Sequence, residues 1–203
     1  MKNKLVKIAF GAALITISSL SVAQFNITKM FDSATGSGAS VTSEGLVKNY
    51  VEGTKYVMSA DVKMLKALGL KEQAAKEELA AKNLTEGATA SALDDAAKVQ
   101  TESSKALANK MNEKKVAIDA EGKKNYTAGL VDLAKGIKNY ATVTNDVKNL
   151  RPSLTSMSAV ESAAYIVKTI PESSSNLLAT LKRAVEFAKE NKIEVPSEAT
   201  SLI

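Results

Sequence analysis

Residues 123–150 read KKNYTAGLVDLAKGIKNYATVTNDVKNL, and the spacing of the apolar residues in this stretch decides the fold. They recur at intervals of three and four, which places them on one face of an α-helix. A helix of this length must bury its apolar face against other elements. The stretch therefore predicts an α-helical protein. The residues on the expected inner face are Tyr126, Leu130, Leu133, Ile137, Tyr140, Thr144 and Val147.

Stretches on both sides show the same periodicity, and no stretch has the strict alternation of a strand. One helix is expected over residues 43–69, weaker helical patterns over 71–83 and 89–118, and shorter helices over 156–169 and 174–191, between which Pro171 breaks or kinks the chain. We predict an all-α fold, an antiparallel bundle of four to six amphipathic helices over residues 43–195, with a C-terminal tail at 196–203. A continuous coiled coil is the alternative, because two segments keep a 3.5-residue repeat.

Three glycines recur every seven residues beside the stripe of 123–150, at Gly122, Gly129 and Gly136. Glycine inside a helix costs about 1 kcal/mol relative to alanine. One explanation is that another helix approaches closely there, and the alanine-rich face of 89–118 is the expected partner. The other is that Gly122 caps a turn and the remaining two are incidental. Gly129 and Gly136 are accordingly candidates for an interaction surface.

The first 23 residues have the three parts of a secretory signal peptide. Lys2, Lys4 and Lys7 precede an apolar run over residues 8–20, and small residues lead to Ala23. The run is shorter than the roughly 20 residues that a transmembrane helix needs. We expect cleavage between Ala23 and Gln24, and export to the periplasm or the exterior of a bacterial cell. A lipoprotein is excluded because the chain has no cysteine to acylate.

Residues 24–42 are expected to form a flexible N-terminal segment with two parts. Phe25, Ile27, Met30 and Phe31 make a short apolar cluster, and residues 33–40 are rich in Gly, Ser, Ala and Thr, as linkers are. Phe25 and Phe31 either dock on the bundle or form an exposed hook for a protein partner or a membrane surface.

The charge of the chain gives no indication of nucleic-acid binding. Removal of residues 1–23 takes three lysines from 27 basic residues and nothing from 22 acidic ones, which leaves a net charge of +2. This small excess is spread along the chain, whereas nucleic-acid-binding proteins gather basic residues on one face. We therefore expect no nucleic-acid partner.

The absence of His and Cys removes most catalytic and metal-binding chemistry. Two adjacent carboxylate pairs, Glu77–Glu78 and Asp94–Asp95, point about 100° apart on a helix and are interpreted as solvated faces. A Ser/Lys hydrolase is the one class of exported enzyme that this composition permits, but Ser104–Lys105 lacks the accompanying motifs. We predict no enzyme activity, no catalytic residue, no cofactor and no metal ligand.

Three polar side chains are expected on buried faces. Asp61 lies on the stripe of residues 43–69, where an unpaired carboxylate would be costly. We expect it at the rim of the bundle or paired with a lysine of a facing helix; a contact that sets the helix register or binds a ligand is the alternative. Tyr126 and Tyr140 also point inward, and their hydroxyls need hydrogen-bond partners in the core or in a ligand groove.

These features predict an exported, non-enzymatic helical bundle that acts through protein–protein contacts as an adaptor, structural or accessory factor. Its partners would be proteins of the cell envelope or a second copy of itself. The alternative is a carrier of lipid or another apolar ligand, or a membrane-active bundle. That alternative rests on the thin Ala/Ser/Gln stripe at 93–118, because a weakly buried helix detaches at low cost.

Overall fold

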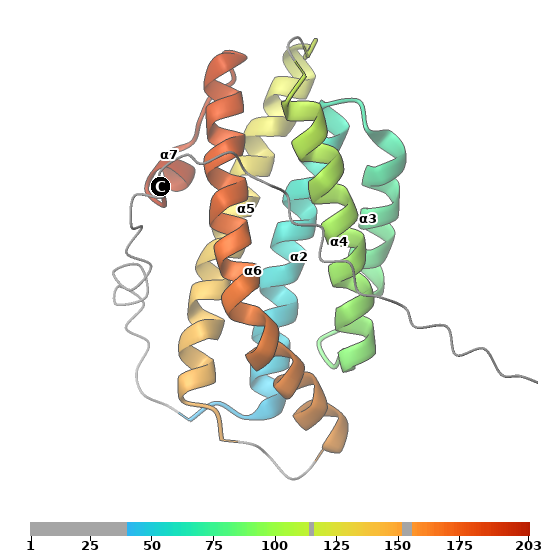
Figure 1. Ribbon diagram of the computed structural model, residues 1–203, viewed down its shortest axis with the longest axis vertical. Coiled ribbons are helices and arrows are strands. Elements are labelled where there is room, and N and C mark those ends of the chain that lie inside the picture. The colour runs from blue at the N-terminus through green and yellow to red at the C-terminus, as the bar shows by residue number, and fades with distance from the viewer. Residues whose placement is uncertain (1–39, 114–115, 152–155) are drawn as a thin grey trace, which may run out of the picture.

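A computed structural model describes residues 40–113, 116–151 and 156–203. These residues form six packed helices, and consecutive helices from α2 to α6 alternate in direction along the long axis (Figure 1). The described part of the chain is all-α, as predicted. The expected signal peptide, its cleavage site at Ala23 and Gln24, and Phe25 and Phe31 lie outside the described residues. The helices are α2 (Ser43–Ala67), α3 (Lys71–Asn83), α4 (Ala90–Met111), α5 (Ala120–Lys148), α6 (Met157–Glu190) and α7 (Ser197–Thr200).

The four longest helices each begin at a side-chain cap. The capping oxygen accepts a hydrogen bond from a backbone N–H of the first turn, which would otherwise have no partner. Gly69 follows the end of α2 with a φ of +78°, a conformation that glycine adopts without strain. The caps are Thr42 for α2, Thr89 for α4, Asp119 for α5 and Ser156 for α6.

The glycines of α5 let it pack closely against α2. A Cβ atom on Gly129 would lie 2.7 Å from Met64 Cγ, and one on Gly136 would lie 2.6 Å from Val57 Cγ2. Both distances are below van der Waals contact, so only glycine fits. The prediction that the alanine-rich helix 89–118 packs against these glycines is wrong, because α2 occupies the glycine face of α5. Gly129 and Gly136 are buried there and offer no surface to another protein.

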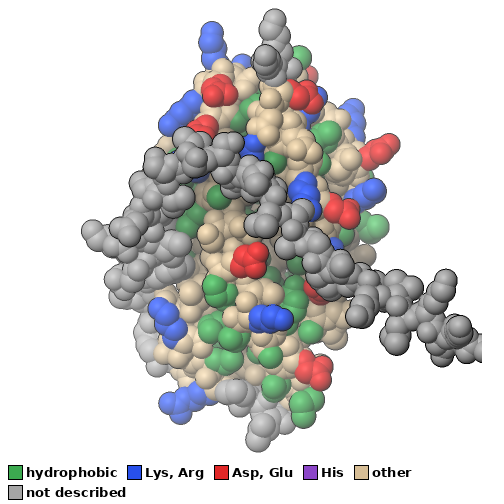
Figure 2. All heavy atoms as spheres, viewed as in Figure 1, with side chains coloured by type: hydrophobic (Ala, Val, Ile, Leu, Met, Phe, Trp, Pro, Cys, Tyr) green, Lys and Arg blue, Asp and Glu red, His purple; other side chains and the backbone are tan. Residues whose placement is uncertain are grey.

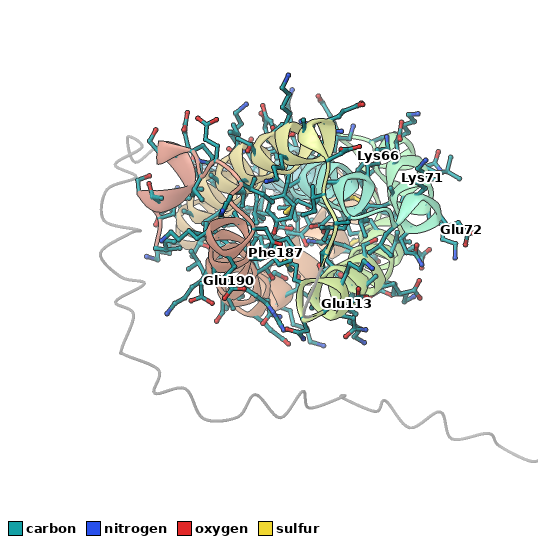
Figure 3. All side chains as sticks on the ribbon, turned by 90° about the horizontal axis from the view of Figure 1, so that it is seen from above. Lys66, Lys71, Glu72, Glu113, Phe187 and Glu190 are labelled. Atoms are coloured by element: carbon teal, nitrogen blue, oxygen red, sulfur yellow. The ribbon has the colours of Figure 1, made fainter. Side chains whose placement is uncertain are left out.

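The core lies between α2, α4, α5 and α6, and α4 contributes Leu93, Ala96, Leu107 and Met111 to it. Seen from above, Phe187 of α6 points into the middle of the bundle, whereas Lys71 and Glu72 at the start of α3 lie at its edge (Figure 3). The ring of Phe187 contacts that of Tyr126 of α5, with centroids 5.5 Å apart. Aromatic pairs of this kind add packing energy beyond the area they bury.

Pro171 lies inside one helix rather than between two, so of the two outcomes expected at this residue the break is wrong and the kink agrees with the structure. α6 runs through it, and Figure 1 shows α6 bending in its lower part. Pro171 is exposed, so its ring faces solvent while the inner face of α6 stays continuous across it. Burial of this face offsets the lost backbone hydrogen bond. The inner face comprises Ser162, Ala163, Ile166, Ile170, Ser174, Leu177 and Leu181.

The end of one other helix differs from the expectation. α4 ends at Met111 rather than near residue 118. The C-terminal tail is packed, because it contains α7 and buries Ala199 and Leu202. Thr127 of α5 also donates a hydrogen bond to the carbonyl of Glu194 at 2.9 Å, which fixes the chain just before the tail.

We predict that Gly136→Ala destabilises the protein. Alanine would normally stabilise a helix by about 1 kcal/mol relative to glycine, but here its methyl group meets Val57 and the backbone of α2. Overpacking of this kind costs about 1–3 kcal/mol, so a net loss of about 1 kcal/mol is expected in urea unfolding. Gly87→Ala is the control, since nothing lies within 4 Å of its Cβ position. A Gly136→Ala variant as stable as the wild type would contradict the close packing.

Candidate functional site: a buried carboxyl pair beside a lysine groove

Two carboxyl groups face each other inside the molecule where α3 packs on α2. Asp61 of α2 is 1% exposed and Glu77 of α3 is 0% exposed, and we refer to these two residues as the carboxyl pair. No lysine or arginine of the described residues forms an ion pair with either of them. Asp61 therefore neither lies at the rim of the bundle nor pairs with a lysine. The first expectation for this residue is wrong. A polar contact that sets the helix register, the alternative, agrees with its position.

Serines of α4 approach the carboxyl pair from a third helix. Ser104 Oγ donates to Asp61 Oδ2 at 3.5 Å, a long hydrogen bond, and Ser103 is buried beside Glu77. Asp61 Oδ1 and both carboxyl oxygens of Glu77 have no hydrogen-bond donor among the described residues. A proton on Glu77 supplies the missing donor, because it can be shared with Asp61. The site is therefore stable when the pair retains at least one proton.

Burial is the main cause of a strong shift in both groups. Desolvation raises the pKa of Asp61 well above its ordinary value, and contacts with Glu77 and Ser104 offset only part of the shift. Desolvation also raises the pKa of Glu77, and the nearby charge of Asp61 raises it further. Like charges in a low-dielectric interior cannot both ionise without a large cost. The pair retains protons at pH values where exposed carboxyls have lost them.

The sequence analysis missed Glu77, which it placed on a solvated face. Only Ala74 and Glu77 of α3 are buried, and Leu79, the one large apolar residue of this helix, is 60% exposed. Ala74, Glu77, Ala81 and Leu84 follow one another at intervals of three and four, which is the spacing of an inner face. That spacing was a signal for burial, but a glutamate on it contradicts the usual rule for charged residues.

The other predicted polar residues are satisfied within the core. Tyr126 is fully buried, and its hydroxyl donates to the carbonyl of Ala184 at 3.2 Å. Tyr140 shares a hydrogen bond with Thr54 Oγ1 at 3.0 Å, and its ring packs on that of Tyr50. Burial raises the pKa of Tyr140 well above its ordinary value. Both tyrosines are therefore core packing residues. This agrees with the expectation that their hydroxyls find hydrogen-bond partners in the core.

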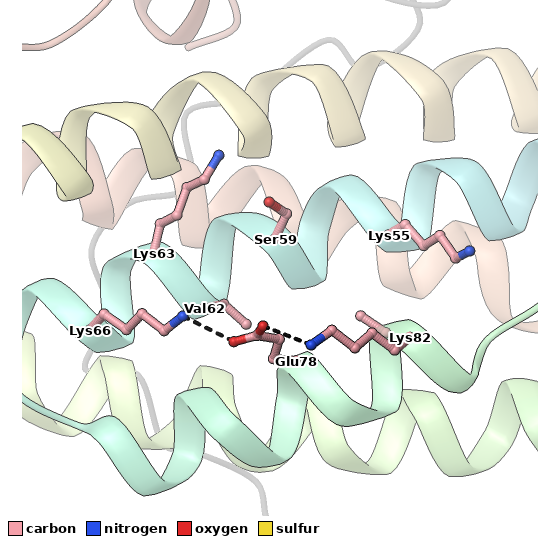
Figure 4. Close-up of a pocket in the computed structure, with 8 residues that line it drawn as sticks. Lys55, Ser59, Val62, Lys63, Lys66, Glu78 and Lys82 are labelled. Carbon is pink, nitrogen blue, oxygen red and sulfur yellow. Dashed lines mark hydrogen bonds and ion pairs between the residues drawn. The ribbon is translucent and has the colours of Figure 1, made fainter.

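A groove lies on the outer side of the same α2–α3 contact (Figure 4). Its volume is about 440 Å³, within the range of small-ligand sites. Four lysines surround an apolar floor of Val62 and Ala81, and we call this feature the lysine groove. Its lining comprises Lys55, Ser59, Val62, Lys63 and Lys66 of α2 and Glu78, Ala81 and Lys82 of α3.

The charges of the lysine groove are only partly neutralised. Glu78 pairs with Lys66 and with Lys82, at 2.9 and 3.0 Å, and these are the dashed contacts of Figure 4. Lys63 pairs with Asp132 of α5 at 2.5 Å. Lys55 has no ion pair among the described residues. Two acidic groups against four lysines leave an excess of positive charge, which attracts an anionic group.

Comparisons with protein-family models, with curated proteins and with solved structures found no match for this chain. Among the described residues, no three acidic side chains converge as metal ligands would. None of the described helices is both long and apolar enough to cross a bilayer.

We predict that the carboxyl pair makes the protein less stable as the pH rises. The folded chain binds more protons than the unfolded chain above the ordinary carboxyl pKa, so the free energy of unfolding falls with pH. The stabilisation is complete below about pH 4 and is lost as the pH rises through the raised pKa values of the pair. The slope is up to about 1.4 kcal/mol per pH unit for each proton released. Urea unfolding between pH 4 and 9 measures it.

Glu77→Gln should be more stable than the wild type above neutral pH and should show a smaller slope, because the amide keeps its size and cannot ionise. Glu78→Gln is the matched control: its carboxyl is exposed and its pKa is lowered by Lys66 and Lys82. Equal slopes for the wild type and Glu77→Gln would show that the pair does not titrate in the interior.

Proposed function

We propose that this protein is an exported, non-enzymatic helical bundle that acts as an accessory factor by binding another protein. The lysine groove is the observation that supports this proposal. It combines an apolar floor with a rim of four lysines, and both of its walls are helices. A surface of this kind is complementary to an acidic segment that also carries apolar side chains.

The floor and the rim would contribute differently to binding. Val62 is 8% exposed and lies at the base of the groove, so a partner's apolar side chain would contact it and lose water. Lys55, which has no ion pair among the described residues, would meet a carboxylate at little cost. Lys66 and Lys82 already share Glu78, and a partner carboxylate would compete with that residue. We therefore expect moderate affinity that falls as the salt concentration rises.

Photocrosslinking tests this proposal. The chain has no cysteine, so Ser59→Cys gives one labelling position inside the lysine groove. The labelled protein is exposed to cell-envelope extract, and the crosslinked partner is then titrated in pure form. Reversal of two groove charges, in Lys55→Glu with Lys82→Glu, should weaken binding by about tenfold, which corresponds to roughly 1.4 kcal/mol.

The matched control reverses Lys124 and Lys168, which are exposed on α5 and α6 and do not line the groove. Binding that survives the groove variant, or that falls equally in the control, would contradict the proposal. If the groove binds anionic vesicles and no protein, its partner is a lipid surface, and the proposal of a protein partner is contradicted.

A second function, carriage of an apolar ligand, is supported by the way α3 is attached. This helix buries only Ala74 and Glu77. Local opening of so small a contact costs little and would uncover apolar side chains of α2. Fluorescence of a dye that brightens in apolar sites should rise between pH 6 and 9 in the wild type. It should rise much less in Glu77→Gln, and an unchanged wild-type signal would remove this function.

A further inference from the structure

The first half of α6 carries a second apolar stripe that faces solvent. Its five residues follow one another at intervals of three and four, so they share one face of the helix. Met157 is 75% and Val167 is 40% exposed, whereas Val160 is half-buried. Figure 2 shows hydrophobic side chains gathered over this part of α6. We call this feature the α6 stripe; its members are Met157, Val160, Ala164, Val167 and Pro171.

The α6 stripe differs from scattered surface hydrophobics. Single exposed apolar residues are common and need no explanation, but a contiguous row usually marks a contact site. The inner face of α6 is already complete without these residues, because Ile166 and Ile170 point into the core. The stripe is therefore available to another segment.

The size of the α6 stripe suits a short peptide segment better than a second copy of the chain. A stable interface between two proteins uses about 20–30 residues on each side. The stripe has five, and at a rise of 1.5 Å per residue residues 157–171 span about 21 Å. A segment of seven or eight residues in an extended conformation covers that length.

The chain carries such a segment shortly before the described residues begin. Residues 25–31, FNITKMF, contain Phe25, Ile27, Met30 and Phe31. The described chain begins beside the end of α5, because Val41 N donates to the Asn149 carbonyl at 3.2 Å and Arg151 N donates to the Val41 carbonyl at 2.9 Å. The start of α6 lies at this same end of the molecule (Figure 1).

The length of the intervening chain allows the contact. Phe31 lies ten positions before Val41, and ten residue steps of chain reach at most about 33–36 Å. That reach exceeds the length of the stripe. Tethering at this distance gives an effective concentration of the order of millimolar, so even a weak apolar contact would be occupied. We propose that residues 25–31 dock on the α6 stripe of the same chain and cover it.

Paramagnetic broadening of methionine methyl signals tests this contact in the chain that begins at Gln24. A nitroxide is attached at Ser33→Cys, which is the only cysteine in the variant. The proposal predicts loss of the Met157 methyl signal. Met64 and Met111 serve as references, because they lie in the last turns of α2 and α4, and these two helices end at the opposite end of the bundle (Figure 1). Their signals should remain.

Two variants distinguish docking on the stripe from chance proximity. Phe25→Ala with Phe31→Ala should restore the Met157 signal, and so should Ala164→Glu, which is exposed and leaves the core intact. Lys168→Glu, also exposed on α6 but outside the stripe, should leave the broadening unchanged. A Met157 signal that persists in the labelled wild-type background would overturn the proposal.

A mixing experiment identifies the source of the segment. Spin-labelled chain is added to unlabelled chain with enriched methionine methyl groups. Broadening of Met157 in this mixture would show that a second copy supplies the segment, which also overturns docking within one chain. Broadening that occurs only when the nitroxide and the Met157 methyl group are in the same chain supports docking within one chain.

Discussion

The close approach of α2 and α5 is the constraint on which the rest of the structure depends. Gly129 and Gly136 of α5 omit a side chain at two points of this contact, where a Cβ atom would meet Ala60, Met64 and Val57 of α2 at 3.0 Å or less. Such contact brings many atoms within van der Waals range and fixes the position of one helix along the other. α6 then completes an apolar core against this pair, with Phe187 against Tyr126.

The other side of α2 has a different character, and this difference defines the candidate site. α3 contributes an alanine and a glutamate to the interior, and α4 contributes serines beside the carboxyl pair. The contact of α3 with α2 buries only Ala74 and Glu77 of α3, so it gains little from apolar burial and depends on a proton shared between Asp61 and Glu77. The same helix forms one wall of the lysine groove. Because α3 carries Glu77 and also forms one wall of the groove, we expect the shape of the groove to depend on the protonation of the pair.

The sequence predicts the elements better than their partners. Heptad spacing identified α5, and the glycines at 129 and 136 indicated close packing, but nothing in one sequence says which helix occupies that face. The boundary at Pro171 failed because burial of a continuous inner face outweighs one lost hydrogen bond. Glu77 was missed because a charged residue on an otherwise weak helix normally marks the solvent side. The lysine groove requires two helices to be placed together, which no local pattern supplies.

Native-state hydrogen exchange tests most directly whether a rigid α2–α5–α6 core carries a loosely attached α3. Amides of α2 and α5 should exchange only through global unfolding. Amides of α3 should exchange through a local opening whose free energy is smaller and decreases as the pH rises from 5 to 8. Protection of α3 equal to that of α2 across this range would contradict the account.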